Sequence, residues 1–388
     1  MKRKARKKLW IKVIFAVLVC LLVLGIFSIP AGADEYETMP GEYTDFFDSI
    51  DGEISDKLPS GLHSGEKGEI NAAAKELIAP AAILGMLVDA LSVGIENAAP
   101  TLALVLGIVV ISAILGTFAR ESGGLSRVVE GCIRLCTFTA ISGIAVKCVE
   151  SLSLYFERLF SAVAAFLPLS AALYAMGGNL TTAASSTTVM GITLTICQFF
   201  CTKTVIPVFC ICLCTSMLSS LEGQEGVSAG GTVSGMIRKW YTAALAFVMM
   251  ILTCSLGGST LLSSKADNVA MRGAKFAVSS FIPVSGGAVS STLGNLAASI
   301  ELLRGSVGII GIVIILMMLL PTLIELALLR GVFLLGGFCA STLGSNAEAK
   351  LLSQLDSLYG YLEGIAVLSA VIFIIAFGVF ASVSTPFG

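Results

Sequence analysis

Charged residues and histidine are scarce in this chain. Of its 388 residues, 13% are Asp, Glu, Lys or Arg, and His63 is the single histidine. Because 56% of the residues are hydrophobic, the composition excludes an ordinary soluble domain and is typical of an integral membrane protein. The formal net charge is only −2, and no basic patch of the kind that binds nucleic acid is present.

The sequence also lacks the motifs that carry common catalytic chemistry. It contains no H-E-x-x-H and no phosphate-binding loop. The eleven cysteines lie almost entirely in apolar runs, where we expect them to pack as small hydrophobic side chains rather than to bind metal. We therefore expect a protein that is not an enzyme and that holds no cofactor and no metal.

The first 98 residues divide into three stretches of different composition. Residues 1–33 combine a basic start, an apolar run and an A-x-A end, which predicts a secretory signal peptide, with an uncleaved anchor as the alternative. Residues 34–76 hold twelve of the 26 acidic residues and only three lysines, so we expect an exported acidic arm that is partly flexible. Residues 77–98 show apolar residues at helical spacing and predict an amphipathic interfacial helix, with burial against other chains as the alternative.

Residues 99–388 predict an all-α polytopic membrane domain with about six to eight membrane-crossing segments. Residues 101–119 form one clear span, and the arginines that follow it place that end in the cytosol. Residues 189–218 form a longer apolar run with a lysine and a proline near the middle. This run predicts either two half-spans or one long kinked helix.

One segment of the membrane domain is too rich in Pro, Gly, Ser and Thr to be an ordinary span. Residues 277–296 read AVSSFIPVSGGAVSSTLGNL and lie between two apolar runs. A broken backbone is tolerated at membrane depth only inside protein or along a wet cavity. The segment opens like residues 162–170, AVAAFLPLS, and GNL follows in both places. We interpret this as an internal duplication over 158–257 and 273–384, with chance similarity of small-residue segments as the alternative.

The duplication selects the candidate site residues. We expect the two broken segments to meet near the bilayer midplane as a pore or gate, with tight packing through small residues as the alternative. Lys203 and Glu325 each lie four residues from a proline inside an apolar run, and we expect them inside the membrane, paired or snorkelling to an interface. The candidate pore, gate or packing residues are Pro168, Gly178, Asn179, Pro283, Gly286, Gly287, Gly294 and Asn295.

A signal peptide, an acidic exported arm and a polytopic body with FIPVSGGAVSSTLGN in its second half resemble the stage III sporulation protein AE family of endospore-forming bacteria. The resemblance covers essentially the whole chain and is most specific in the F-I-P-V-x-G-G-A-[VL]-S run. It implies a membrane component of the channel complex between mother cell and forespore, which supports late forespore gene expression. The implied partners are other membrane and intermembrane-space subunits and a cytosolic ATPase of the same operon. The resemblance supplies no catalytic residues.

These observations leave three functions open. The first is a permease-like subunit of a sporulation transport or secretion channel, located in the mother-cell membrane with its arm on the intermembrane side. The second is a non-conducting scaffold that anchors ring proteins of the same complex, and the third is an independent secondary transporter. In each case the chain contacts the lipid bilayer and not nucleic acid, and a homo-oligomer is compatible with all three.

Overall fold

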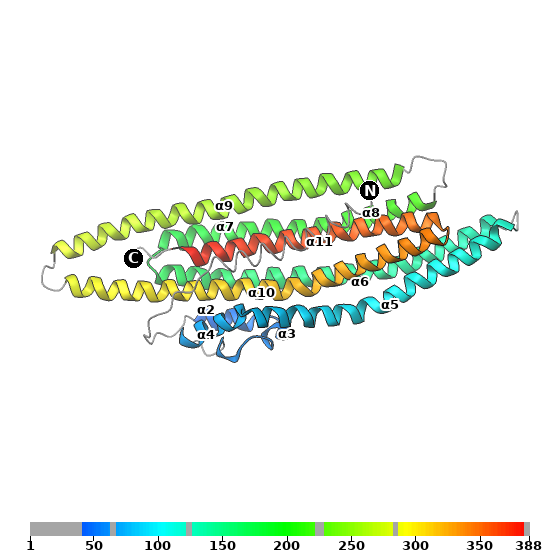
Figure 1. The fold of residues 1–388 in the computed structure, drawn as a ribbon. Helices are drawn as coiled ribbons and strands as arrows, with labels where there is room; N and C mark the ends of the chain where they lie inside the picture. The colour runs from blue at the N-terminus through cyan, green and yellow to red at the C-terminus, as the bar shows by residue number, and fades with distance from the viewer. Residues whose placement is uncertain (1–40, 63–66, 122–125, 222–228, 282–285, 384–388) are drawn as a thin grey trace.

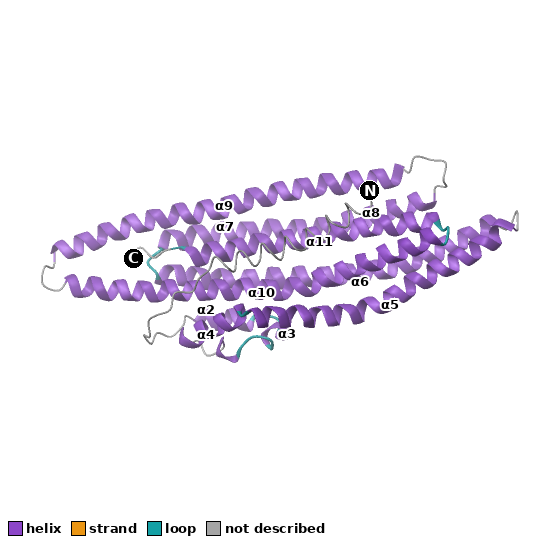
Figure 2. Cartoon of the chain, viewed as in Figure 1, coloured by secondary structure: helices purple, strands orange, loops and turns teal. Residues whose placement is uncertain are grey.

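The computed structural model describes residues 41–62, 67–121, 126–221, 229–281 and 286–383, and their regular structure is entirely helical. The predicted signal peptide, 1–33, lies outside these residues. Figure 1 shows long helices running alongside one another in an elongated bundle, with short N-terminal helices against one side of it. Figure 2 shows helices and loops without a strand in the described ranges. The prediction of an all-α polytopic membrane protein is confirmed.

Six segments of the described chain are long and apolar enough to cross a membrane, and each has 37–43 residues. At 1.5 Å per residue such helices are about 55–65 Å long, whereas the hydrocarbon core of a bilayer is about 30 Å thick. The bundle therefore continues beyond the hydrocarbon core. Its helices are α5 (Pro80–Glu121), α6 (Ser126–Met176), α7 (Leu180–Gln198), α8 (Val205–Leu221), α9 (Ala229–Phe281), α10 (Gly286–Thr342) and α11 (Asn346–Ser382).

The long apolar run 189–218 forms one continuous helical segment rather than two half-spans. A π-helical turn, η3 (Phe199–Thr204), joins α7 to α8. Pro207 has no N–H to donate to the carbonyl of Lys203, four residues earlier, and η3 ends one residue after that lysine. The wider turn thus lies where the proline removes a helical hydrogen bond.

Part of the acidic arm is folded against the bundle. Its elements are α2 (Gly41–Asp48), α3 (Gly52–Ser55), η1 (Ser60–Leu62) and α4 (Lys67–Ile78). The ring of Phe46 lies 5.9 Å from that of Phe166 on α6, and the Nε of Arg158 on α6 lies 2.7 Å from an Asp51 carboxylate oxygen. Tyr43, Phe46, Phe47, Ile50, Ile54, Leu58 and Leu62 are buried. Residues 41–62 are therefore a structured part of the molecule.

The predicted interfacial helix 77–98 is not a separate element. Helix α4 ends at Ile78, and α5 begins at Pro80 and continues through Pro100 to Glu121, so the stripe from residue 80 onward and the first span belong to one helix. Gly94 allows this helix to approach α10 closely, because a Cβ there would lie 2.8 Å from Cγ2 of Ile324. The outward face of α5 carries exposed apolar side chains such as Leu84 and Val88. Such a face suits contact with lipid or another apolar surface.

The antiparallel pair α10 and α11 forms the centre of the bundle. A Cβ at Gly308 would lie 2.7 Å from that of Ala381, and a Cβ at Gly311 would overlap the ring of Phe377. Small residues let two helices approach within membranes, where there is no hydrophobic force to hold them together. The same Phe377 ring packs 4.0 Å from that of Phe166, which joins α6 to the pair.

A carboxylate of α9 caps the N-terminus of α7. The N-cap residue Asn179 makes no side-chain hydrogen bond to the helix, and Asp267 accepts one from each of the Thr181 and Thr182 backbone N–H groups instead, at 3.1 and 2.8 Å. The hydroxyl of Thr182 donates to the same carboxylate at 2.7 Å. A negative charge at a helix N-terminus is stabilising, so Asp267 fixes α9 against α7.

Replacing Gly311 by Ala is expected to lower the free energy of unfolding by about 1–3 kcal/mol, because the added methyl group displaces the Phe377 ring. The matched control is Gly305→Ala on the same helix, where a Cβ meets no atom within 4 Å. Thermal unfolding of the purified protein in detergent measures both. Equal stability of the two variants would contradict the packing described here.

Replacing Asp267 by Ala is expected to lower the free energy of unfolding by about 2 kcal/mol, because two backbone N–H groups and a hydroxyl lose a charged acceptor. Asp267→Asn keeps the shape and one acceptor oxygen and should cost less. Hydrogen exchange at the first turn of α7 provides the local measurement. Unchanged protection there in Asp267→Ala would show that the cap does not depend on Asp267.

Candidate functional site

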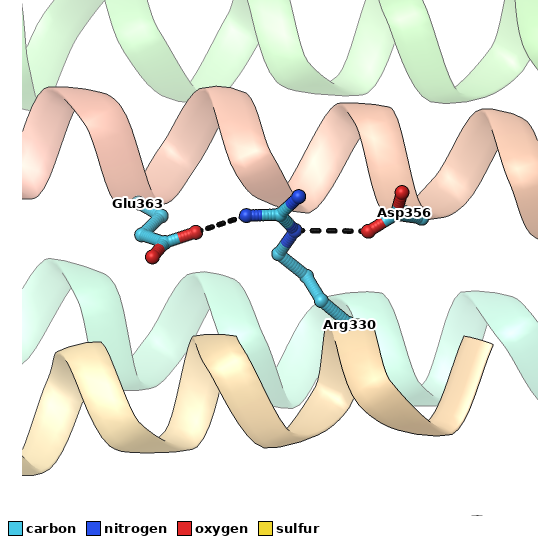
Figure 3. Close-up of polar contacts among 3 residues, drawn as sticks. All are labelled: Arg330, Asp356 and Glu363. Atoms are coloured by element: carbon cyan, nitrogen blue, oxygen red, sulfur yellow. Dashed lines mark hydrogen bonds and ion pairs between the residues drawn. The ribbon is translucent and has the colours of Figure 1, made fainter. Parts of the chain in front are cut away.

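A cluster of three charged side chains lies between α10 and α11. Figure 3 shows Arg330 of α10 reaching across to two carboxylates of α11, Asp356 on one side and Glu363 on the other. The Nε of Arg330 donates to Asp356 at 2.9 Å, and its Nη1 donates to Glu363. The three side chains are only 10%, 18% and 12% exposed, in that order. The cluster is therefore largely shielded within the helical bundle.

The spacing along α11 explains why both carboxylates meet one arginine. Asp356 and Glu363 are seven residues apart, which is two helical turns, so they project from the same face. Gly360 lies between them and makes room for the guanidinium, because a Cβ there would lie 3.0 Å from Cζ of Arg330. Two carboxylates and one guanidinium leave the cluster with one negative charge in excess when all three are ionised.

Two further carboxylates lie along the same helix pair. Glu325 on α10 accepts a hydrogen bond from the Ser151 hydroxyl of α6 at 3.3 Å. At another level of the bundle, Glu348 on α11 accepts one from Ser112 on α5. Acidic and basic side chains inside membrane bundles are costly, and they mark the routes of ions and protons in pumps and transporters. Each of these carboxylates can bind and release a proton.

The expected pair of Lys203 and Glu325 is not formed in the described part of the chain. Lys203 lies in the π-helical turn η3 with an exposed side chain. Glu325 is half-buried and directed toward Ser151. The two proline-containing runs therefore do not bring their charges together. The physical reason is that η3 presents Lys203 to the outer surface of the bundle, whereas Glu325 faces α6.

The first of the two repeated segments contains a turn that connects α6 to α7. Pro168 lies inside α6, which continues without a break to Met176. Gly178 has a φ of +77°, a left-handed conformation that favours glycine, and Asn179 occupies the N-cap position of α7. The turn in this segment is therefore at Gly178 and not at the proline.

The second repeated segment is arranged differently. Helix α9 ends at Phe281 and α10 begins at Gly286, so Pro283 falls outside the described residues. Gly286, Gly287, Gly294 and Asn295 all belong to the first turns of α10. The GNL motif is thus a turn in one segment and helix in the other. Figure 1 shows the C-terminal end of α9 and the N-terminal end of α10 together at one end of the bundle, not halfway along it as expected for a midplane gate.

Sequence reasoning missed the three residues of the charged cluster. Arg330 looks like the end of a span, and residues 344–358 look like a polar helix or loop. The usable signal is the D-x-x-x-G-x-x-E pattern at 356–363, which places two acids and a glycine on one helical face. Pairing that face with an arginine on the preceding helix requires the register of α10 against α11, which only the fold provides.

The fold and the charged cluster define a class of protein: an all-helical, multi-pass membrane protein whose central helix pair buries ionisable side chains. The family model of stage III sporulation protein AE matches residues 67–384 of the 388, and the chain belongs to that family. This membership gives the protein a role in stage III sporulation. No curated protein and no solved structure matches the chain.

Replacing Arg330 by Met is expected to lower the free energy of unfolding by about 3–5 kcal/mol, because two shielded carboxylates lose their counter-charge. Unfolding of the purified protein in detergent measures this loss. The matched variant is the triple Arg330→Met, Asp356→Asn, Glu363→Gln, which removes all three charges and should recover most of the stability. Wild-type stability of the single variant would mean that solvent reaches the carboxylates.

Proposed function

We propose that this protein is the permease-like membrane subunit of a sporulation transport or secretion channel between mother cell and forespore. The observation that carries the proposal is the cluster of Arg330, Asp356 and Glu363 between α10 and α11. A membrane protein that only anchors others has no need of three charges inside its central helix pair, and such charges are costly to bury. The family supplies the setting, stage III of sporulation.

The polar route that we propose follows α10 and α11 rather than the Gly-rich segment 277–296. Carboxylates at Glu325, Glu363 and Glu348 occur along this helix pair, and hydroxyls of Ser151 and Ser112 face two of them. The charge of the cluster would be coupled to passage of an ion or a solute. The glycine-rich segment between α9 and α10 would then lie at one end of the bundle, outside the proposed polar route.

The remaining expectations belong to the same proposal. The protein would reside in the mother-cell membrane around the forespore with its arm on the intermembrane side. Other membrane and intermembrane-space subunits would be its partners, and a cytosolic ATPase of the same operon would supply energy, since this chain acts without catalysis of its own. The support for an outward arm is the acidic, lysine-poor composition of 34–76 together with the arginines at the opposite end of α5.

The folded arm favours a second candidate function, a scaffold that conducts nothing. Residues 41–62 are held on α6 through Arg158 and Asp51 and through the contact of Phe46 with Phe166. A structured surface outside the spans is what a scaffold would offer to ring proteins. The two functions differ in what the central charges contribute, and this difference can be measured.

The experiment compares sporulating cells that carry the wild type or the triple variant Arg330→Met, Asp356→Asn, Glu363→Gln. The triple variant removes the charges while keeping side-chain volume, so it should accumulate and assemble normally. We expect late forespore reporter expression to fall to the level of cells that lack the chain. Co-purification of the other subunits confirms that the variant still assembles.

The matched control is Gly305→Ala on α10, which meets no neighbour and should sporulate normally. Wild-type sporulation by the triple variant would overturn the channel proposal and leave the scaffold as the function. A scaffold further predicts that Asp51→Asn combined with Arg158→Met, which loosens the arm, abolishes assembly while the central charges are intact.

A further inference from the structure

Two charges face outward deep within membrane-crossing segments of the bundle. Lys203 is exposed on η3, 14 residues before the end of the 38-residue segment Leu180–Met217. Glu96 is exposed on α5, 16 residues after the start of the 38-residue segment Pro80–Thr117. At 1.5 Å per residue, each lies about 20 Å or more from the nearer end of its segment. Lipid tails offer no counter-charge at such a depth, where a charge is costly.

Each charge belongs to a polar stripe on an otherwise apolar outer face. On α5, Asp89, Ser92 and Glu96 are all exposed and lie three and four residues apart, so they share one helical face. On the other segment, exposed Gln198 lies five residues before Lys203, which is the spacing of one π-helical turn. Polar side chains on an apolar face hold helices together within membranes.

The described chain contains no partner for these side chains. Neither Lys203 nor the two carboxylates of the α5 stripe form an ion pair in the described ranges, and the Gln198 side-chain amide makes no hydrogen bond there. Exposed apolar side chains surround both stripes and could form the rest of a contact. They are Leu84, Leu87, Val88, Leu91 and Ile95 on α5, and Ile192, Phe199 and Ile211 on the other segment.

The depth of Glu96 in the bundle is given by the contact of α5 with α10. A Cβ at Gly94 would lie 2.8 Å from Cγ2 of Ile324 and 2.9 Å from Cδ1 of Leu328. Helices α5 and α10 run in the same direction (Figure 1). Glu96, two residues after Gly94, is therefore level with the turn of α10 that ends at Leu328.

The depth of Lys203 follows from the packing of α8. The ring of Tyr359 on α11 lies 5.9 Å from that of Phe209 on α8 and 4.9 Å from that of Phe333 on α10. Phe209 is therefore about level with Phe333. Since α8 also runs in the direction of α10 (Figure 1), Lys203, six residues earlier, is level with Ala327. Lys203 and Glu96 thus lie within about one helical turn of the same depth.

The two faces belong to different sides of the molecule. Helix α5 packs on α10, α6 and α4, whereas α7 and α8 pack on α9, α6 and α11. In the view of Figure 1, α5 follows one edge of the bundle and α9 follows the opposite edge. The α5 stripe and the Lys203 stripe therefore cannot meet within one chain.

We propose that the two stripes join neighbouring copies of this chain in the membrane. Lys203 of one copy pairs with Glu96 of the next copy. The Gln198 amide donates to Asp89, and these two residues lie five and seven positions before the charged pair. The contact buries both polar stripes between apolar faces and gives each charge a partner. It is independent of the Arg330 cluster.

The equal depth of the two stripes favours a second copy as the occupant. Copies of one chain are inserted in the same orientation, so two copies in a membrane are related by rotation about its normal. Groups that pair across such a contact must lie at the same depth, and Lys203 and Glu96 do so. The two faces differ, so the contact is head-to-tail, and its repetition forms a ring if the rotation closes.

The test measures association of full-length copies that carry two different tags. Both copies are expressed together in a host without other sporulation subunits and are extracted from membranes in mild detergent. Capture of one tag should recover the other tag from wild-type copies. Lys203→Glu in both copies, or Glu96→Lys in both copies, is expected to lower this recovery about tenfold or more, because like charges then face each other.

Two combinations restore opposite charges and should restore recovery. The first is the double variant Lys203→Glu, Glu96→Lys in both copies. The second combines a copy that carries only Lys203→Glu with a copy that carries only Glu96→Lys, since every contact between unlike copies then joins opposite charges. The matched control is Lys147→Glu, an exposed lysine of α6 that lies on neither stripe, and it should leave recovery unchanged.

Thermal unfolding in detergent confirms that each variant is folded. Recovery that is undiminished in both single variants would overturn the proposal, as would a loss that neither combination restores. Wild-type copies that fail to recover one another would also overturn it. Association that requires the other sporulation subunits would assign these faces to one of those subunits and not to a second copy.

Discussion

The close approach of α10 to α11 is the contact on which the rest of the structure depends. It requires glycine at Gly308, Gly311 and Gly360, because a side chain at any of these positions would meet Ala381, Phe377 or Arg330. The short interhelical distance puts Arg330 within hydrogen-bond reach of two carboxylates and packs Phe377 against α6. Charge burial and apolar packing are therefore consequences of one backbone geometry.

The length of α10 separates two buried arginines. Arg304 and Arg330 are 26 residues apart on one helix, which corresponds to about 39 Å. This exceeds the hydrocarbon thickness of about 30 Å, so the two arginines cannot both lie near the centre of a bilayer. The helix that forms the centre of the bundle thus carries two arginines with different surroundings. Arg330 contacts two carboxylates of α11, whereas the Nη2 of Arg304 donates to the backbone carbonyl of Val383.

Family membership and structure contribute different parts of the functional argument. The match over 67–384 gives the stage of sporulation and does not show what the protein does at that stage. The structure identifies ionisable groups inside a helical bundle, and the proposed transport role rests on these groups. The folded arm on α6 shows that a bundle with such an interior also carries a structured surface outside its spans.

The sequence by itself determined the class of the protein, because an apolar composition with long uncharged runs has no stable alternative to membrane-spanning helices. It also indicated the proline-disturbed helix near Pro207 and the family. Only the tertiary structure decided which charges meet. Lys203 and Glu325 look like partners along the chain, yet η3 presents Lys203 outward, and Arg330 finds its carboxylates on α11. The reason is that helical periodicity fixes the face on which a residue lies, whereas the register between two helices depends on side-chain packing across their interface.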